Sequence, residues 1–241
     1  MNANKISASY NPQLVYNRTM KLKSFGCSFF YGSDLSDQID HDFPPYAHGD
    51  STWPALISKH YGFDYECYAE PGVGNFKILC DIIAQSSLDD PSIFLINWTW
   101  IDRFDFVNDL EQWTTIRPSD ESDKAEIYYR NFHSQIKDMI TSVYNINTAI
   151  DFLNERKIPF VMSYMDYNIL DLVNTDWHDP RYLSTMQNKI KKYLVNFQGK
   201  NFLDWSREQG FAISDRYHPL EDAHRAAANY MMPIVESLLQ K

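Results

Sequence analysis

Hydrophobic positions follow two different patterns along the chain. Residues 92–96 have the length of a strand, and after Ser92 at their start all of them are apolar. Such a run is typical of a parallel strand buried on both faces. In residues 76–87, by contrast, apolar side chains such as Leu79 and Ile83 recur at helical spacing. Strand-like and helix-like segments alternate in this way over most of the sequence.

These patterns predict strands and helices in regular succession. The expected strands are residues 21–27, 64–69, 92–96, 157–162 and 201–204. The expected helices are residues 53–61, 76–87, 131–156, 184–197 and 220–239. Such alternation favours an α/β fold, a three-layer α/β/α sandwich around a parallel sheet of about five strands in a flavodoxin-like arrangement.

Capping residues support two of the helix boundaries. Ser51 or Thr52 can cap the helix at 53–61, and Gly62 follows its last residue. Asn75 stands before the helix at 76–87 and is expected to cap it.

A single domain over residues 1–241 is expected, because no repeat, low-complexity tract or linker divides the chain. Residues 1–20 are polar and predict a loose N-terminal arm. Residues 99–130 and 166–198 are predicted to be insertions, the first of them irregular.

Composition and charge exclude several classes of function. The net charge of −10 disfavours nucleic acid as a partner, because an acidic surface repels phosphates. Three cysteines without metal-type spacing argue against a disulfide framework or a zinc site and favour a reducing, cytoplasmic setting. No signal peptide or membrane-spanning segment is visible, so no membrane partner is expected.

Three loops are expected at the carboxyl edge of the sheet, where active residues of open α/β folds gather. In the first, Ser28 follows the first strand. A serine hydroxyl becomes a nucleophile when a base accepts its proton, but Gly-x-Ser by itself is equally typical of a turn or a helix cap.

The second loop is the segment AEPGVGN at residues 69–75. Gly72 and Gly74 permit sharp bends or close backbone approach, and exposed N–H groups there can stabilise an oxyanion. A capped turn between strand and helix is the alternative interpretation.

The third loop carries Asp215 and His218, followed by Pro219, just before the last helix. A carboxylate three residues before an imidazole can reach one ring nitrogen, which leaves the other free to act as a general base. The alternative is a helix N-terminus that Asp215 merely caps.

Taken together, these loops resemble the SGNH hydrolase superfamily, also called GDSL-like esterases and lipases. Gly26-Cys27-Ser28 resembles the family's Gly-Asp-Ser block, with cysteine in place of the aspartate. Gly72 matches the glycine of the second block, and residues 215–219 match the final Asp-x-x-His-Pro. The resemblance covers the framework from about residue 21 to residue 239.

The resemblance implies acyl transfer without a cofactor or metal. Ser28 would be the nucleophile, His218 its base and Asp215 the residue that orients His218. The backbone N–H groups of Ser28 and Gly72 would form the oxyanion hole. The Gly-x-Ser-x-Gly elbow of α/β-hydrolases is not present around Ser28.

The family's third block, Gly-x-Asn-Asp, has no counterpart in INWTWIDR at residues 96–103. The third oxyanion donor is therefore open between Asn75, Asn97 and Thr99, or is absent. The segment is expected to shape a substrate pocket, whose residues are Trp98, Thr99, Trp100 and Arg103. Arg103 is open to two interpretations, an anion-binding residue or half of a structural ion pair.

Other reactive residues favour structural roles. Cys27 is expected to be buried and inert. His41 and His48 lie in an acidic loop whose spacing fits no calcium site. His224 is six residues beyond His218, off its helical face, and is expected on the helix surface or as a packing partner.

The sequence thus predicts a serine esterase acting on a small ester or an acylated, for example acetylated, carbohydrate. The alternative is a catalytically weak or inactive SGNH-fold protein with a carbohydrate-binding or structural role. A nucleotide-binding flavodoxin-like protein is a third hypothesis, disfavoured because no glycine-rich phosphate loop follows the first strand. The acyl group, the alcohol and the oligomeric state stay open.

Overall fold

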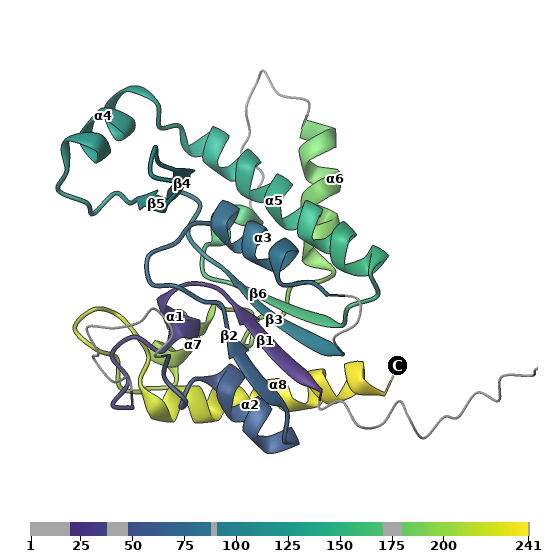
Figure 1. Ribbon diagram of the computed structural model, residues 1–241. Helices are drawn as coiled ribbons and strands as arrows, with labels where there is room; N and C mark the ends of the chain where they lie inside the picture. The colour runs from purple at the N-terminus through teal and green to yellow at the C-terminus, as the bar shows by residue number, and fades with distance from the viewer. Residues whose placement is uncertain (1–19, 38–47, 88–90, 171–179, 241) are drawn as a thin grey trace, which may run out of the picture.

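Four parallel strands form the centre of the computed structural model, which describes residues 20–37, 48–87, 91–170 and 180–240. The strands lie in the order β2-β1-β3-β6 (Figure 1). Their bounds are Lys21–Phe25 for β1, Asp64–Cys67 for β2, Ser92–Trp98 for β3 and Phe160–Tyr164 for β6. All seven residues of β3 are buried, as expected for a strand inside a parallel sheet.

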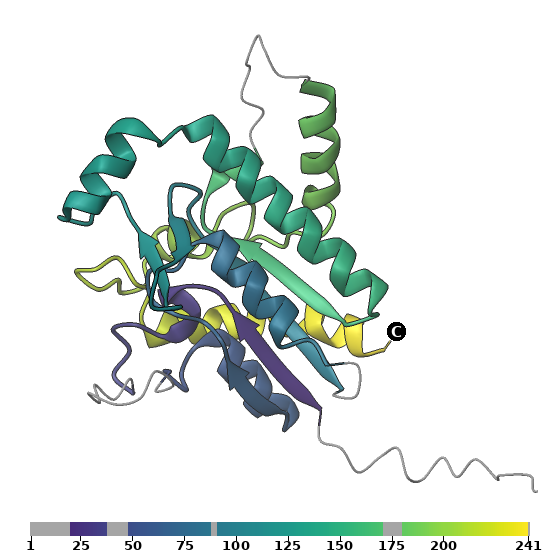
Figure 2. The same ribbon diagram turned by 45° about the horizontal axis from the view of Figure 1, so that its top comes forward.

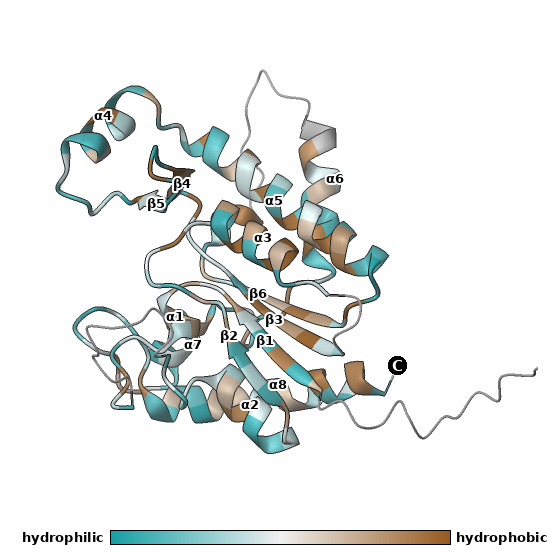
Figure 3. Ribbon diagram, viewed as in Figure 1, coloured by the Kyte–Doolittle hydropathy of each residue, from teal (hydrophilic) through white to brown (hydrophobic). Residues whose placement is uncertain are grey.

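Helices cover both faces of this sheet. On one face lie α3 (Asn75–Ala84) and α5 (Gln135–Glu155), with α6 (Pro180–Lys191) beside α5 (Figure 1). On the other face α2 (Trp53–Tyr61) packs against α8 (Glu221–Leu239). Strands β3 and β6, between the two helical layers, are mostly apolar, whereas helix α4 (Asp123–Asn131) is mostly polar (Figure 3). The expected three-layer α/β/α fold is confirmed.

The sheet has four strands instead of the expected five, because residues 202–208 form helix α7 (Phe202–Glu208) and not a strand. Asn201 caps this helix by accepting a hydrogen bond from the Asp204 N–H at 2.8 Å. A short apolar segment is compatible with a strand or a helix, and here the cap at Asn201 stabilises the helix.

The insertion after β3 is ordered, contrary to the expectation of an irregular segment. It contains an antiparallel hairpin of β4 (Phe104–Val107) and β5 (Trp113–Ile116), followed by α4 (Asp123–Asn131). The predicted helix at 131–156 corresponds to α5, which begins only at Gln135 and has Ser134 as its N-cap. The hairpin stands at the end of the sheet where β1 leads into α1 (Ser28–Tyr31) (Figure 2).

Helix α2 has the expected bounds, with Thr52 as its N-cap and Gly62 as its C-cap. The predicted cap of α3 is wrong, because Gly74 occupies the N-cap position and Asn75 is the first helical residue. The predicted helix at 184–197 ends early, at Lys191.

Two further expectations fall largely outside the described residues. Of the N-terminal arm only Met20 is described, and the second insertion is described at η2 (Tyr167–Ile169) and from residue 180 onward. Among the helices that the structure describes, none combines the length and apolarity needed to cross a membrane.

Candidate active site

Ser28 begins the one-turn helix α1 directly after strand β1, and only 8% of its surface is exposed. As the first residue of a helix, it has no intrahelical partner for its N–H group. Gly26 allows the chain to pass close to β3, since a Cβ there would lie 3.1 Å from the Asn97 carbonyl oxygen. This close passage sets Ser28 at the carboxyl edge of the sheet.

His218 lies directly against this serine. Its Nε2 is 2.9 Å from Ser28 Oγ, a hydrogen-bond distance between residues 190 positions apart. The ring of Phe29 packs edge-on against the imidazole, with centroids 5.2 Å apart. The sequence prediction that Ser28 and His218 meet agrees with this geometry.

A tight turn before α8 holds His218 in place. Ser214 Oγ accepts a hydrogen bond from the His218 N–H at 3.1 Å, and the Ser214 N–H donates to the His218 carbonyl at 2.8 Å. Tyr217, inside this turn, has φ of +66°, a left-handed conformation that is unfavourable for an aromatic residue. Backbone strain of this kind is concentrated at functional sites.

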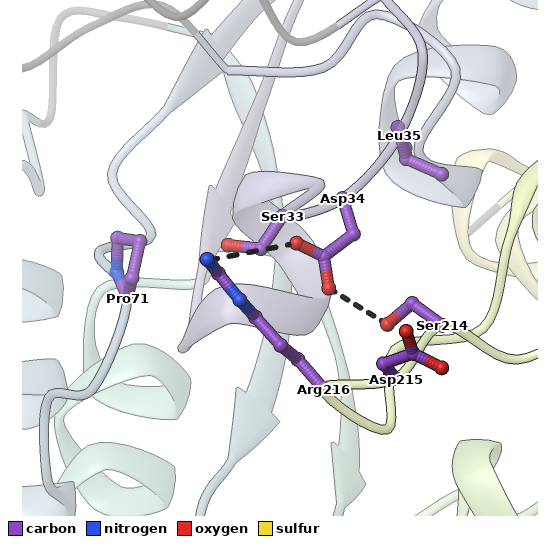
Figure 4. A pocket seen from close by; sticks show the side chains of 7 residues that line it. All are labelled: Ser33, Asp34, Leu35, Pro71, Ser214, Asp215 and Arg216. Atoms are coloured by element: carbon purple, nitrogen blue, oxygen red, sulfur yellow. Dashed lines mark hydrogen bonds and ion pairs between the residues drawn. The ribbon is translucent and has the colours of Figure 1, made fainter.

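The carboxylate beside His218 belongs to Asp34 and not to the expected Asp215. Asp34 Oδ2 lies 2.7 Å from His218 Nδ1 and also accepts a hydrogen bond from Ser214 Oγ at 2.7 Å. Asp215 is exposed, and within the described part of the chain no hydrogen bond joins it to His218. Figure 4 shows Ser214 and Arg216 reaching the Asp34 carboxylate while Asp215 stays apart.

Asp34 reaches this position through a reversal of the chain after α1. Gly32 ends the helix with φ of +84°, and Asp34 itself has φ of +69°. Aspartate tolerates the left-handed region better than most residues. No periodic pattern marks Asp34, which looked like one of several acidic loop residues, so sequence reasoning overlooked it.

The environment of Asp34 favours its ionised form. Partial burial opposes ionisation, but the hydrogen bonds from His218 and Ser214 and the nearby Arg216 outweigh it and lower the pKa of Asp34. Ser28, His218 and Asp34 therefore form a chain of hydrogen bonds that ends in a carboxylate. Such a chain can accept a proton from a serine and stabilise the resulting imidazolium.

The side chain of Asn75 is not available as an oxyanion donor. Its two Nδ2 hydrogens are used by the Thr99 carbonyl at 3.2 Å and by Ser142 Oγ at 3.1 Å. Its Oδ1 accepts from the Thr99 N–H at 2.8 Å. Asn75 thus anchors the loop after β3 to helix α3, in place of the expected capping and donor roles.

Asn97 is equally unsuited to hold an oxyanion. It is fully buried in β3, and its Nδ2 points to Met165 Sδ at 3.6 Å. Thr99 is also fully buried. Of the predicted oxyanion donors, the backbone N–H groups of Ser28 and Gly72 are left as candidates, and Gly72 has φ of +86° and does not line the cavity over Ser28 described below.

Gly74 has a separate role in the second loop. A Cβ at this position would lie 2.6 Å from Asp105 Oδ2, so only glycine lets this carboxylate approach. Asp105 of the hairpin then accepts hydrogen bonds from the N–H groups of Gly74 at 2.8 Å and Lys77 at 2.9 Å. The insertion therefore supplies the N-terminal cap of α3.

A cavity of about 310 Å³ opens over Ser28 and His218. Of the four expected pocket residues, Trp100 and Arg103 line it, whereas Trp98 and Thr99 are buried in the core and do not. The described residues that line the cavity are Ser28, Phe29, Trp100, Arg103, Leu203, Arg207, Arg216, Tyr217 and His218. A second cavity of about 540 Å³ adjoins Asp34 and shares Arg216 with the first (Figure 4).

The other reactive residues have structural surroundings. Cys27 is fully buried, as expected. His224 is a buried packing partner whose Nδ1 accepts a hydrogen bond from the Trp53 N–H at 3.1 Å. His41 lies outside the described residues, and His48 is 3.6 Å from Asp50. In the part of the chain that the structure describes, no cluster of three potential metal ligands is present.

No family model and no curated protein matches the chain. Solved structures do. The esterase EstA from Pseudoalteromonas sp., in a form inhibited by monoethylphosphonate, is similar at 12% identity and a TM-score of 0.52 over 92% of this chain and 99% of EstA. A carbohydrate esterase whose active site "displays divergent catalytic and non-catalytic binding functions" is similar at 13% identity and a TM-score of 0.50, over 92% of this chain and 70% of that one.

A third similar structure is an acetyl xylan esterase, Est2A, from the rumen bacterium Butyrivibrio proteoclasticus. Its identity to this chain is 13% and its TM-score 0.48, over 93% of this chain. The chain spans 65% of the length of Est2A. The similarity to EstA and to the carbohydrate esterase shows a shared fold, and at these identities substrate and activity have to be argued from the residues.

Proposed function

Because the chain has the fold of the SGNH hydrolases, we propose that it is a serine esterase in which Ser28 forms an acyl intermediate. The observation that carries this proposal is the hydrogen-bond chain from Ser28 Oγ through His218 to Asp34, at 2.9 and 2.7 Å. Ser28 and His218 line a cavity of about 310 Å³, which is large enough for a small ester.

In the proposed reaction, His218 Nε2 takes the hydroxyl proton while Ser28 Oγ attacks the ester carbonyl carbon. Asp34 keeps Nδ1 protonated and stabilises the imidazolium that forms. The carbonyl oxygen becomes an oxyanion held by the backbone N–H groups of Ser28 and Gly72. His218 then donates its proton to the departing alcohol, and a water activated by His218 hydrolyses the acyl-serine.

We propose an acylated, for example acetylated, carbohydrate as the substrate class. Trp100 and Tyr217 line the cavity, and aromatic faces bind sugar rings through their apolar surfaces. The fold-level similarity to a carbohydrate esterase supports the same class.

Hydrolysis of 4-nitrophenyl acetate tests the proposal. We expect turnover by the unchanged protein and loss of at least about a thousandfold in kcat for Ser28→Ala and His218→Ala. A serine-directed phosphonate should label Ser28 and leave the Ser28→Ala variant unmodified. The esterase proposal fails if several acyl groups are not hydrolysed and no label is incorporated.

A second candidate is a weakly active or inactive carbohydrate-binding protein. It is favoured by one observation, that the side chains of Asn75 and Asn97 are both committed elsewhere and leave only backbone donors for an oxyanion. Loss of one such donor typically costs about a hundredfold or more in rate. Binding in a glycan screen without any turnover of the acylated forms would support this candidate over the esterase.

A further inference from the structure

Among the residues that the structure describes, three arginines and no carboxylate line the cavity over Ser28. Arg103, Arg207 and Arg216 contribute the positive charge, while the remaining lining is apolar, aromatic or belongs to Ser28 and His218. The protein as a whole carries a net charge of −10, so this concentration of positive charge runs against its general character.

Acidic side chains neutralise these arginines only weakly. Among the described residues Arg103 has no ion pair within 4 Å, although it attracts the carboxylates of Asp102 and Asp120 at longer range. Its Nη1 donates to the Val73 carbonyl at 2.9 Å. Arg207 has a single long contact of 3.5 Å to Asp204. Arg216 is 3.8 Å from Asp34 Oδ1, and its side chain is 82% exposed. Beyond these contacts with described residues, the three guanidinium groups have further N–H groups that can donate to a ligand in the cavity.

Aromatic rings hold two of these guanidinium groups in defined orientations. Arg103 lies over the ring of Trp100 at 4.7 Å from its centroid, and Arg207 lies over the ring of Tyr217 at 5.5 Å. Stacking fixes the plane of a guanidinium and leaves its edge N–H groups free for bidentate bonds to an anion. The strained backbone of Tyr217 contributes to this placement.

We propose that the substrate of this site carries an anionic group, a carboxylate, sulfate or phosphate, in addition to its ester. The inference rests on the proposed esterase function and narrows its substrate class. Arg207 and Arg216 bind the anion, and Arg103 adds positive charge from its place on Trp100. Charge attraction also draws such an ester toward a protein whose other surfaces repel it.

Paired ester substrates test the inference. In 4-acetoxybenzoate the anion is on the alcohol, and methyl 4-acetoxybenzoate is its neutral partner. In mono-4-nitrophenyl glutarate the anion is on the acyl group, and its methyl ester is the neutral partner. We expect at least one anionic ester to exceed its neutral partner about tenfold in kcat/KM. That preference should weaken with added salt, because exposed charges are screened.

Arg207→Gln is the variant that separates charge recognition from catalysis. We expect KM for the preferred anionic ester to rise about fivefold and KM for its neutral partner to rise clearly less, as suits a half-exposed arginine. The double variant Arg207→Gln/Arg216→Gln should lose more than about tenfold in kcat/KM for that ester. Arg225→Gln is the matched control, since Arg225 makes the same i,i+3 pair to an aspartate on a helix but does not line the cavity.

Equal rates for charged and neutral esters, or an equal effect of Arg207→Gln on both, would overturn the inference. If no ester is hydrolysed, the esterase proposal fails. Whether the cavity binds an anion is then tested separately, by measuring ligand binding. Calorimetry on Ser28→Ala should then detect 4-hydroxybenzoate but not its methyl ester, and adding Arg207→Gln should weaken that binding about fivefold. Absence of binding to the Ser28→Ala protein would exclude the anion site as well.

Discussion

At the scale of single residues, the carboxylate beside His218 comes from the other end of the chain. Asp34 and His218 are 184 positions apart, whereas Asp215 is only three residues from His218 and is exposed. Proximity in sequence was a poor guide, because the turn at residues 214–218 directs Asp215 outward and uses Ser214 to hold both His218 and Asp34.

Replacing each aspartate by asparagine distinguishes their roles. We expect Asp34→Asn to lower kcat on the order of a thousandfold, because the amide no longer stabilises the imidazolium and favours the wrong tautomer. Asparagine tolerates the left-handed backbone of this position, so the fold should persist. Steady-state kinetics with 4-nitrophenyl acetate provide the measurement.

Asp215→Asn is the control and should change kcat by no more than about twofold, since the side chain is exposed. The reverse result, with Asp215→Asn as the damaging change, would show that Asp34 is not the catalytic carboxylate.

At the scale of elements, short turns with constrained backbones position the site. Gly32 closes the single turn of α1 and leads directly to Asp34. A Cβ on Gly32 would lie 2.8 Å from Thr52 Cγ2 and 3.0 Å from Leu35 Cδ1. The turn is therefore restricted both by its left-handed φ and by its neighbours.

Gly32→Ala should consequently destabilise the protein more than a left-handed φ alone explains. We expect a loss of about 1–2 kcal/mol from the backbone conformation and about 1–3 kcal/mol from overpacking, measured by urea unfolding. The displaced Asp34 should also lower kcat.

Gly210→Ala isolates the backbone contribution, since Gly210 has φ of +75° and an added methyl group there would meet no atom within 4 Å. The Gly210→Ala variant should lose only about 1–2 kcal/mol, which comes from the backbone conformation, and it should keep its activity. Equal destabilisation by the two substitutions would argue against the packing restriction at Gly32.

At the scale of the whole molecule, His224 joins α8 to the start of α2. It is 2% exposed, and its Nδ1 accepts a hydrogen bond from the Trp53 N–H. Burial lowers the pKa of His224 to about 3 from its ordinary value of 6.5. The imidazole is neutral in the folded protein over a pH range in which the unfolded chain binds a proton.

Stability should therefore fall as the pH decreases from about 6.5 toward about 3. Over this window the unfolded state binds one more proton at His224 than the folded state, which costs up to about 1.4 kcal/mol per pH unit. Above pH 6.5 the contribution of His224 to stability is complete. Urea unfolding at a series of pH values measures the slope.

His224→Asn keeps an acceptor near the Trp53 N–H but cannot titrate, so its stability should depend less on pH in this window. His60→Asn, at an exposed position of α2, is the control, and this variant should still lose stability as the pH decreases. If His224→Asn shows the same slope as the unchanged protein, the acid sensitivity has another source.

The sequence by itself determined the layers of the fold and four residues of the candidate site, which are Ser28, His218, Trp100 and Arg103. Apolar runs and helical periodicity depend on local physics. They predicted all four strands of the described sheet, with β6 beginning three residues later than expected, and most helices, because burial of one face favours one period. Ser28 and His218 were predictable because each follows or precedes a regular element at the same edge of the sheet.

Only the tertiary structure decided the rest. Asp34, Arg207 and Arg216 have no distinctive local pattern. Contacts between distant parts of the chain bring Asp34 to His218 and place the two arginines around the cavity over Ser28. The predictions for residues 201–204 and for the insertion after β3 were wrong, because short segments are compatible with several local patterns. The cap at Asn201 stabilises a helix in the first case, and the contact of Asp105 with the start of α3 stabilises a hairpin in the second. Local periodicity specifies where elements lie, whereas the partners of individual polar side chains depend on contacts between distant parts of the chain.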